Sequence, residues 1–411
     1  MKYYKRENYL VPIRGFYHDA DIIKVITGIR RCGKSTLLEM IKDELLEEGI
    51  LPSQIVHIKL DRRGYKSITA PDALEAAIEA TTNPAWMNYL FIDEVQRVEG
   101  FEDVVNAFRE EGNYSIFITG SNSYLLSGEL ITRLTGRYLE FEMQTLAFDE
   151  YIGMKRAYGK TVSPHLQDEL EEYILAGGFP HAVLLNSPED KRTYVEGVVA
   201  EIIEKDIRRK AKIRHVSVFE RVMGYIINNF AASTSIKAIR DYFANVEGIS
   251  ITEDTIARYI RILENAKVIS RCSRFDMKSR KSLAGEQKYY LADLGIYFSR
   301  NADNRINYGP VLENLLYNYA KSRGYAVSVG RIGQLECDFI LRRHAFEYAY
   351  VQVAYTILAD NATEEREYRP LELIHDNYPK YVLTADSLLQ KRNGIIHANI
   401  AEFMMNGELF G

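Results

Sequence analysis

The eight residues from Gly28 to Ser35, Gly-Ile-Arg-Arg-Cys-Gly-Lys-Ser, constrain this chain more than any other segment. They follow a run with strand composition, residues 21–27, and precede residues 36–46, in which leucine and isoleucine recur at helical spacing. A glycine-bearing loop between a strand and a helix lets backbone N–H groups close on phosphate oxygens at the helix N-terminus. The pattern GxxxxGK[ST] in this setting therefore predicts a phosphate-binding P-loop.

The lysine and the serine at the end of this loop have separate predicted tasks. Lys34 is expected to reach the β- and γ-phosphates of ATP, and the hydroxyl of Ser35 is expected to bind Mg²⁺. ATP and Mg²⁺ are accordingly the predicted ligands. The residues predicted to contact the nucleotide are Gly28, Ile29, Arg30, Arg31, Cys32, Gly33, Lys34, Ser35 and Thr36.

A second motif supplies two carboxylates. Residues 89–94 form an apolar run that ends in Asp93 and Glu94, and open α/β sheets bind ligands at the carboxyl ends of their strands. We expect Asp93 to hold Mg²⁺, directly or through water, and Glu94 to polarise the attacking water. Because a P-loop enzyme mainly positions groups and stabilises charge, this pair predicts ATP hydrolysis as well as binding.

A third strand is expected at residues 115–120, followed by the polar tip Ser121-Asn122-Ser123. Asn122 is a candidate for sensing the γ-phosphate or orienting the water. The same tripeptide would also form an ordinary helix-capping turn, so both interpretations stay open.

Seven segments spread along the chain form a set: 26–38 (ITGIRRCGKSTLL), 91–96 (FIDEVQ), 118–123 (ITGSNS), 134–137 (LTGR), 148–151 (FDEY), 173–180 (YILAGGFP) and 205–207 (KDI). Together they resemble the prokaryotic AAA+ ATPases in which an AAA_14-type ATPase domain is joined to a DUF4143 carboxy-terminal region. The resemblance covers nearly the whole chain, and its amino-terminal motifs are the more specific ones.

The resemblance implies an α/β fold with several domains. A P-loop AAA+ ATPase core is expected at residues 1–150, and a helical lid and connector at 151–215. A winged-helix module is expected at 216–300. A PD-(D/E)xK nuclease-like, restriction-endonuclease-like α/β domain, the DUF4143 region, is expected at 301–411.

Two arginines stand just before a strand expected at residues 138–143. In AAA+ proteins this is where arginine fingers stabilise transition-state charge on ATP bound by a neighbouring subunit. Arg133 and Arg137 are the candidates, and a homo-oligomer is the assembly that such a finger requires. Arginines are also common on protein surfaces, so a finger role for either residue stays open.

Residues 205–281 form a basic segment in an acidic protein. They carry seventeen Lys and Arg against eight Asp and Glu, whereas the whole chain has a net charge of −5. Three helices and a hairpin are predicted here, with the arginines of the third helix facing away from its apolar stripe. Insertion of that helix into duplex DNA would use the excess charge, while a lid or protein-adaptor role is the alternative. The candidate DNA contacts are Arg258, Arg261, Arg280 and Lys281.

The carboxy-terminal domain carries an incomplete nuclease motif. Glu313 on an apolar helix and Asp338 on a strand occupy the acidic positions of the core that the resemblance implies. Where Glu-x-Lys is expected, the chain has Gln352-Val-Ala354, which lacks a carboxylate and an ammonium. We therefore expect Glu313, Asp338 and Gln352 to form a degenerate nuclease site without appreciable activity, unless a lysine from elsewhere, such as Lys380, replaces the missing one.

Composition narrows the class of protein further. The three cysteines lack metal-ligand spacing, and no run approaches eighteen apolar residues. A cytoplasmic protein that binds ATP and ADP, without a membrane partner, is expected.

Three functions are compatible with the sequence. The first is an ATP-driven machine or switch whose nucleotide state controls engagement of duplex DNA or a protein partner. The second is a slow-turnover signalling or defence switch that works by assembly, and the third is an ATP-gated, metal-dependent nuclease.

Overall fold

The computed structural model describes residues 3–83, 85–120, 134, 136–208, 211, 213–279, 281–301, 305–343 and 347–410, with the backbone alone at 281–284. The chain divides into two compact units. Unit 1 comprises residues 1–143 and 265–267, and unit 2 comprises residues 144–264 and 268–411.

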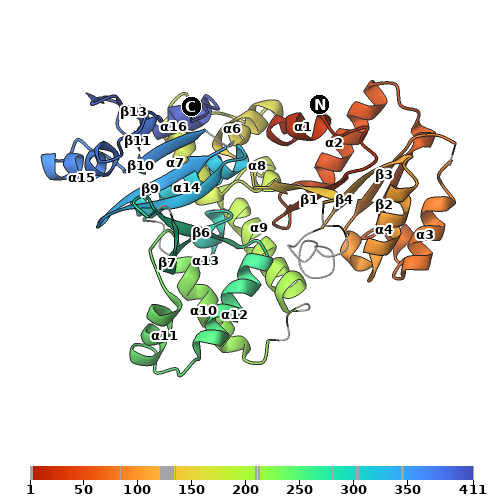
Figure 1. Ribbon diagram of the computed structural model, residues 1–411, viewed down its shortest axis with the longest axis horizontal. Coiled ribbons are helices and arrows are strands. Elements are labelled where there is room, and N and C mark those ends of the chain that lie inside the picture. Colours follow the sequence, from red (N-terminus) through yellow and green to blue (C-terminus); the bar gives the residue numbers. More distant parts are fainter. Residues whose placement is uncertain are drawn as a thin grey trace. The chain divides into compact units, whose positions relative to one another are not determined.

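Unit 1 is built on a parallel sheet of five strands. The strands are β1 Ile23–Gly28, β2 Ile55–Lys59, β3 Asn88–Asp93, β4 Tyr114–Thr119 and β5 Tyr138–Met143. They lie in the order β2-β3-β4-β1-β5 (Figure 1). The inner strands β1, β3 and β4 are buried along their whole length, which explains their continuous apolar sequences. The four strands expected in this half of the chain are all present.

Helices cover both faces of this sheet. They are α1 Glu7–Arg14, α2 Lys34–Glu47, α3 Pro71–Glu79 and α4 Phe101–Glu110, with single 3-10 turns at Pro52–Gln54, Arg63–Tyr65 and Val95–Arg97. Buried side chains of α3 and α4 pack with Ile23 and Val25 on one face, and α2 lies on the other (Figure 1). A parallel sheet covered on both faces is the α/β architecture that the P-loop motif predicts.

Unit 2 begins with helices, as expected for residues 151–215. They are α6 Phe148–Ala157, α7 Leu166–Ala176, α8 Pro180–Leu184 and α9 Pro188–Glu201, followed by the π-helical turn η5 Ile202–Arg208. The buried ammonium of Lys155 ties α6 to α7, because it pairs with Glu169 and Glu172 at 2.7 and 2.8 Å. Their role as a lid stays a prediction.

Next come the helices and the hairpin that the basic segment predicts. They are α10 Val216–Asn228, α11 Ile236–Asn245, α12 Glu253–Asn265, β6 Ile269–Asp276 and β7 Lys281–Leu291. Polar side chains begin two of these helices: Ser235 accepts the N–H of Ala238 at 3.1 Å, and Thr252 accepts that of Thr255 at 3.3 Å. The order of elements agrees with a winged-helix module, which stays a prediction.

The rest of unit 2 adds six strands and four helices among the described residues. The strands are β8 Ala326–Ile332, β9 Leu335–Arg342, β10 Tyr348–Val353, β11 Lys380–Thr384, β12 Lys391–Arg392 and β13 Ile395–Asn399. The helices are α13 Gly295–Arg300, α14 Tyr308–Ser322, α15 Asn361–Glu372 and α16 Ile400–Met405. The neighbouring strands expected near residues 335–341 and 349–355 are β9 and β10, which pair antiparallel.

The hairpin β6–β7 belongs to the same sheet as these strands. The order is β12-β13-β11-β10-β9-β8-β6-β7, with residues 274–276 of β6 parallel to β8 (Figure 1). The last residues of β6, next to the loop at 277–280, are therefore hydrogen-bonded to β8. Less of the hairpin is then free to project toward a ligand. In the described part of the chain, no helix is both long and apolar enough to cross a membrane.

Candidate nucleotide site and the acidic cluster of unit 2

The P-loop connects the carboxyl end of β1 to the first turn of α2. Gly28 ends β1 with φ +138°, and a Cβ atom there would lie 2.3 Å from the carbonyl oxygen of Met143. Gly33 has φ +110° and caps α2 without a side-chain hydrogen bond. Both positions require glycine, since an L side chain would clash at the first and be strained at the second. The first N–H groups of α2 face the loop and suit an anion.

Lys34 is the first residue of α2, and its side chain turns back into the loop. The residue is 5% exposed. Its Nζ donates to the carbonyl oxygens of Gly28 at 2.9 Å and Ile29 at 3.1 Å. An ammonium held by two neutral carbonyls keeps its positive charge, so it can exchange these acceptors for phosphate oxygens.

The other predicted nucleotide contacts vary in exposure. Ile29 and Cys32 are buried, whereas Arg31 and Ser35 are exposed; Arg30 and Thr36 lie between these extremes. Arg31 adopts φ +68°, a left-handed conformation that is uncommon outside glycine. The exposed Ser35 hydroxyl is accessible to a cation at the start of the helix.

Asp93 ends β3 beside the end of β4, and the two strands are paired neighbours. Its carboxylate is 3% exposed and accepts the hydroxyl proton of Thr119. The next residue, Glu94, donates its backbone N–H to the same hydroxyl oxygen at 3.1 Å. Glu94 has φ +59°, so its backbone turns sharply out of the strand. Thr119 thus fixes both acidic residues, a role that the sequence analysis missed.

The Glu94 carboxylate has a second neighbour that the sequence analysis missed. Gln96 donates from Nε2 to Glu94 Oε2 at 2.5 Å. Gln96 stands two residues after Glu94, where the 3-10 turn folds its side chain back. Gln96 belongs to the motif segment 91–96, which could have indicated a role in the site. Its contact with Glu94, however, depends on the 3-10 turn.

A hydroxyl at Ser35 and a carboxylate at Asp93 form a donor set that fits Mg²⁺, which prefers oxygen ligands and keeps part of its coordination for water and phosphate. Within the described residues, no group of three or more His, Cys, Asp or Glu side chains could hold a metal ion. Phosphate oxygens of the nucleotide and water would supply the other ligands of a bound Mg²⁺.

Of the predicted γ-phosphate sensor and arginine fingers, only Arg137 is among the described residues. Asn122 and Arg133 lie outside the described residues. Arg137 stands at the amino end of β5, where its carbonyl accepts the N–H of Ile23 at 2.9 Å, and its guanidinium donates to Asn106 at 3.0 Å. Arg137 therefore lies at the amino ends of the strands, whereas the P-loop of the same chain lies at their carboxyl ends. Action of Arg137 across a subunit interface stays a prediction.

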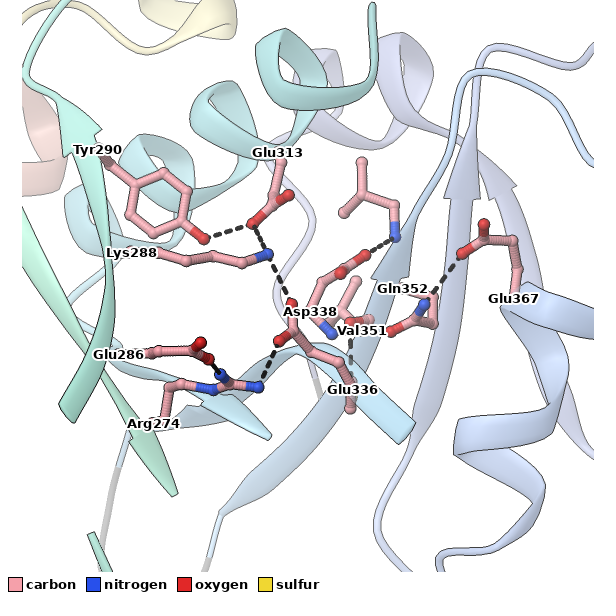
Figure 2. A network of polar contacts seen from close by, with 12 residues as sticks. Arg274, Glu286, Lys288, Tyr290, Glu313, Glu336, Asp338, Val351, Gln352 and Glu367 are labelled. Atoms are coloured by element: carbon pink, nitrogen blue, oxygen red, sulfur yellow. Dashed lines mark hydrogen bonds and ion pairs between the residues drawn. The ribbon is translucent and has the colours of Figure 1, made fainter. Parts of the chain in front are cut away.

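The residues of the degenerate nuclease site do come together in unit 2. Figure 2 shows Glu313 from α14, Asp338 from β9 and Gln352 from β10 around one region. Gln352 accepts the N–H of Asp338 at 2.7 Å, while Asp338 accepts that of Val353 at 2.9 Å. These side chains line a cleft of about 660 Å³.

A lysine and two further carboxylates that were not among the predicted site residues complete this acidic cluster. Lys288 from β7 pairs with Glu313 and Glu336, each at 2.8 Å (Figure 2). Glu367 from α15 accepts the amide of Gln352 at 2.9 Å. The proposed replacement by Lys380 is wrong, because its ammonium donates to the carbonyl of Asp376 at 3.1 Å instead.

Burial and neighbouring charges both shift the pKa values of the side chains in the acidic cluster. Burial raises the pKa of Glu313, and burial together with the charge of Glu313 raises the pKa of Asp338 well above its usual range. Burial alone would lower the pKa of Lys288, but the surrounding carboxylates outweigh it, so the pKa is raised. Lys288 therefore stays protonated at neutral pH and neutralises part of the cluster.

The candidate DNA contacts lie on and beyond α12. Arg258 and Arg261 are exposed, and the buried residues of that helix face the other way. Neither guanidinium has an ion-pair partner among the described residues. Arg280 lies outside them, and so does the side chain of Lys281.

Two family profiles match this chain. A family profile described as an AAA domain matches residues 20–152, and one described as a domain of unknown function, DUF8612, matches residues 167–304. An uncharacterized protein of Haemophilus influenzae is 34% identical over 383 residues, which is 92% of each chain. The chain belongs to this family of AAA-domain proteins. The uncharacterized protein MJ1544 of Methanocaldococcus jannaschii is 28% identical over 368 residues, 85% of this chain and 78% of that one.

A solved structure supports the fold of this AAA-domain protein. The Walker-type ATPase PABY2304 of Pyrococcus abyssi superposes with a TM-score of 0.52 at 16% identity, over 73% of this chain and 96% of the other. The AAA domain and the P-loop geometry together support ATP binding and hydrolysis. The DUF4143 designation is not shown, because the profile matched after the ATPase domain is DUF8612.

Proposed function

We propose that this AAA protein hydrolyses Mg·ATP at the P-loop and uses its nucleotide state to control how unit 2 engages duplex DNA or a protein partner. The observation that carries the ATPase part is the arrangement of Lys34, Asp93 and Glu94. Lys34 lies inside the loop and donates to two neutral backbone carbonyls, and Thr119 at the end of β4 holds both acidic residues at the end of the neighbouring strand β3.

Each residue has a task that follows from its place. Backbone N–H groups of the loop and the ammonium of Lys34 bind the phosphates. Ser35 and Asp93 would hold Mg²⁺, which supplies charge neutralisation at the phosphates when it is bound. Glu94 accepts a hydrogen bond from the attacking water and orients it toward the terminal phosphate, while Thr119 prevents the strained turn at Glu94 from relaxing.

Substitution of Glu94 tests this assignment. Glu94→Gln keeps the size and hydrogen bonding of the side chain, so ATP affinity should stay within about threefold while turnover falls about 100-fold, within the range for a positioned acid–base group. Exposed Glu99 on the same loop is the matched control, and Glu99→Gln should retain wild-type turnover. Hydrolysis by Glu94→Gln at the wild-type rate would show that this carboxylate does not orient the water.

Engagement of duplex DNA is supported by the basic character of residues 205–281 and by the exposed Arg258 and Arg261, which have no ion-pair partner among the described residues. The experiment compares ATP turnover with and without duplex DNA and measures the mass of the protein in solution. Turnover stimulated by DNA supports a machine or switch that acts on DNA. Slow turnover that ignores DNA but follows a change of assembly supports the signalling or defence switch instead.

We further propose that the acidic cluster is a scaffold without nuclease activity. The supporting observation is Lys288, whose ammonium already pairs with Glu313 and Glu336 where a metal ion would need free carboxylates. Incubation of the purified protein with DNA and Mg²⁺ or Mn²⁺ should give no cleavage. Cleavage by the wild type that disappears in Asp338→Ala would overturn this proposal.

A further inference from the structure

The segment before β1 lies against the P-loop, although its sequence carries no nucleotide-binding motif. Arg6 is 4% exposed, and its Nη1 donates to the carbonyl oxygen of Cys32 at 3.1 Å. Its guanidinium also lies over the ring of Tyr9, 4.6 Å from the centroid. A buried arginine, 26 residues away in sequence, thus contacts the backbone of the phosphate-binding loop.

Arg6 contacts the peptide group between Cys32 and Gly33, and phosphate binding depends on whether the N–H or the carbonyl of that group points into the loop. No cis peptide bond occurs in the described residues, so the carbonyl of Cys32 and the N–H of Gly33 point in opposite directions. A donor on the carbonyl holds the oxygen outside the loop, and the N–H of Gly33 then points inside. A carbonyl turned inward would instead repel a phosphate oxygen.

Glycine makes this peptide easy to turn. Gly33 has φ +110°, and glycine visits many backbone conformations at little cost. Without a contact on its carbonyl, the peptide between Cys32 and Gly33 has little to hold it in the binding orientation. The hydrogen bond from Arg6 supplies that restraint from outside the loop.

A second group of contacts fixes the segment to the same helix that the loop begins. Glu44, near the end of α2, accepts Arg14 Nη2 at 2.7 Å, Tyr17 Oη at 2.8 Å and Lys5 Nζ at 3.2 Å. Hydrogen bonds from Arg14 outweigh burial and lower the pKa of Glu44 to about 2, so it stays ionised at neutral pH. Arg6 is therefore presented to the loop by a segment anchored elsewhere on α2.

We propose that Arg6 is a positioning residue of the nucleotide site, which holds the Cys32–Gly33 peptide with its N–H directed at the phosphates. The proposal rests on the ATPase function proposed above. It adds the amino-terminal segment, residues 3–17, to a site that the P-loop motif alone would place after residue 27. Because Arg6 contacts the backbone of the loop, its removal should affect binding of the nucleotide more than the chemical step.

The test compares binding of Mg·ATP and Mg·ADP by calorimetry in the full chain. Arg6→Ala should weaken both nucleotides about 10-fold, the loss expected for one hydrogen bond from a charged donor. Its kcat at saturating ATP should stay within about twofold of wild type. Arg6→Lys, which keeps one donor and the charge, should recover part of the affinity.

Arg14→Ala is the matched control, because it removes one anchor of the same segment while Tyr17 and Lys5 still bind Glu44 and the contact to the loop stays. It should lower the melting temperature while changing nucleotide affinity less than about threefold. Wild-type affinity in Arg6→Ala, or an equal loss of affinity in Arg14→Ala, would overturn the proposal. Absence of ATP binding by the wild type would instead refute the ATPase function on which it rests.

Discussion

The two units each hold a buried lysine in a candidate site, but the lysines have different partners. In unit 1, Lys34 donates to two backbone carbonyls, and within the described residues no carboxylate pairs with it. In unit 2, Lys288 pairs with Glu313 and Glu336. Carbonyls satisfy hydrogen bonds without cancelling charge, whereas carboxylates cancel it. The comparison indicates that a buried lysine can recruit an anion only where its charge is uncancelled.

The largest expected effect is on nucleotide affinity. Lys34→Ala removes charge-assisted hydrogen bonds to two phosphates, each worth about 1.5–3 kcal/mol, so ATP affinity should fall about 1,000-fold. Lys288→Gln should leave it within about twofold, because that ammonium serves only the acidic cluster. Calorimetric titration of both variants with Mg·ATP makes the measurement. A similar loss of ATP affinity in the two variants would show that the two lysines do not differ in this way.

The next effect concerns the stability of unit 2. Lys288→Met leaves the largely buried Glu313 without its counter-ion, whereas Glu336 keeps its ion pair with Arg274. The substitution should cost about 3–5 kcal/mol in urea unfolding followed by circular dichroism. Lys380→Met is the control, since its ammonium lies 3.9 Å from the carboxylate of Asp376 and should cost about 1 kcal/mol or less. Equal stability of Lys288→Met and wild type would mean that the cluster does not need its lysine.

A smaller effect should appear in the pH dependence of stability. The pKa of Asp338 is raised in the folded state, so ionisation of this carboxyl opposes folding and stability falls as the pH rises above its unfolded value of about 4. Asp338→Asn keeps an acceptor for the N–H of Val353 and removes that charge. In thermal unfolding measured from pH 5 to pH 8, the free energy of unfolding of the variant should rise relative to that of wild type. The difference should reach about 1 kcal/mol at pH 8. A less stable variant at pH 8 would show that the ionised carboxylate is needed.

The smallest effect tests charge that is exposed rather than buried. Removal of the charges of Arg258, Arg261, Arg280 and Lys281 should flatten the salt dependence of duplex DNA binding, with ATP affinity unchanged. The logarithmic slope should fall by roughly 0.9 for each phosphate that the variant no longer neutralises. Arg221→Gln is the control, because its guanidinium already pairs with Glu247. Failure of the wild type to bind duplex DNA at low salt, with or without nucleotide, would assign this module to protein contacts.

Much of the nucleotide site could be predicted because its parts are adjacent in sequence. The glycines, Lys34 and Ser35 fall within eight residues, and Asp93 with Glu94 ends one apolar strand. A strand that is buried on both faces needs apolar residues throughout, so polar residues at its end stand out. The helices and hairpin of the basic segment could be predicted for the same reason, from spacing and capping residues alone.

The residues that hold these groups in place became visible only in the tertiary structure. Arg6 reaches the site from a segment that no motif connects to it, and Thr119 contacts Asp93 only because β4 pairs with β3. In unit 2, Gln352 stands where the motif would have a carboxylate, but only the fold brings Glu367 beside that amide and Lys288 beside Glu313. Local sequence determines which groups one loop or strand end presents, since backbone geometry fixes neighbours a few residues apart. Sheet order and helix packing decide which distant charges meet, and therefore which lysine keeps its charge for a ligand.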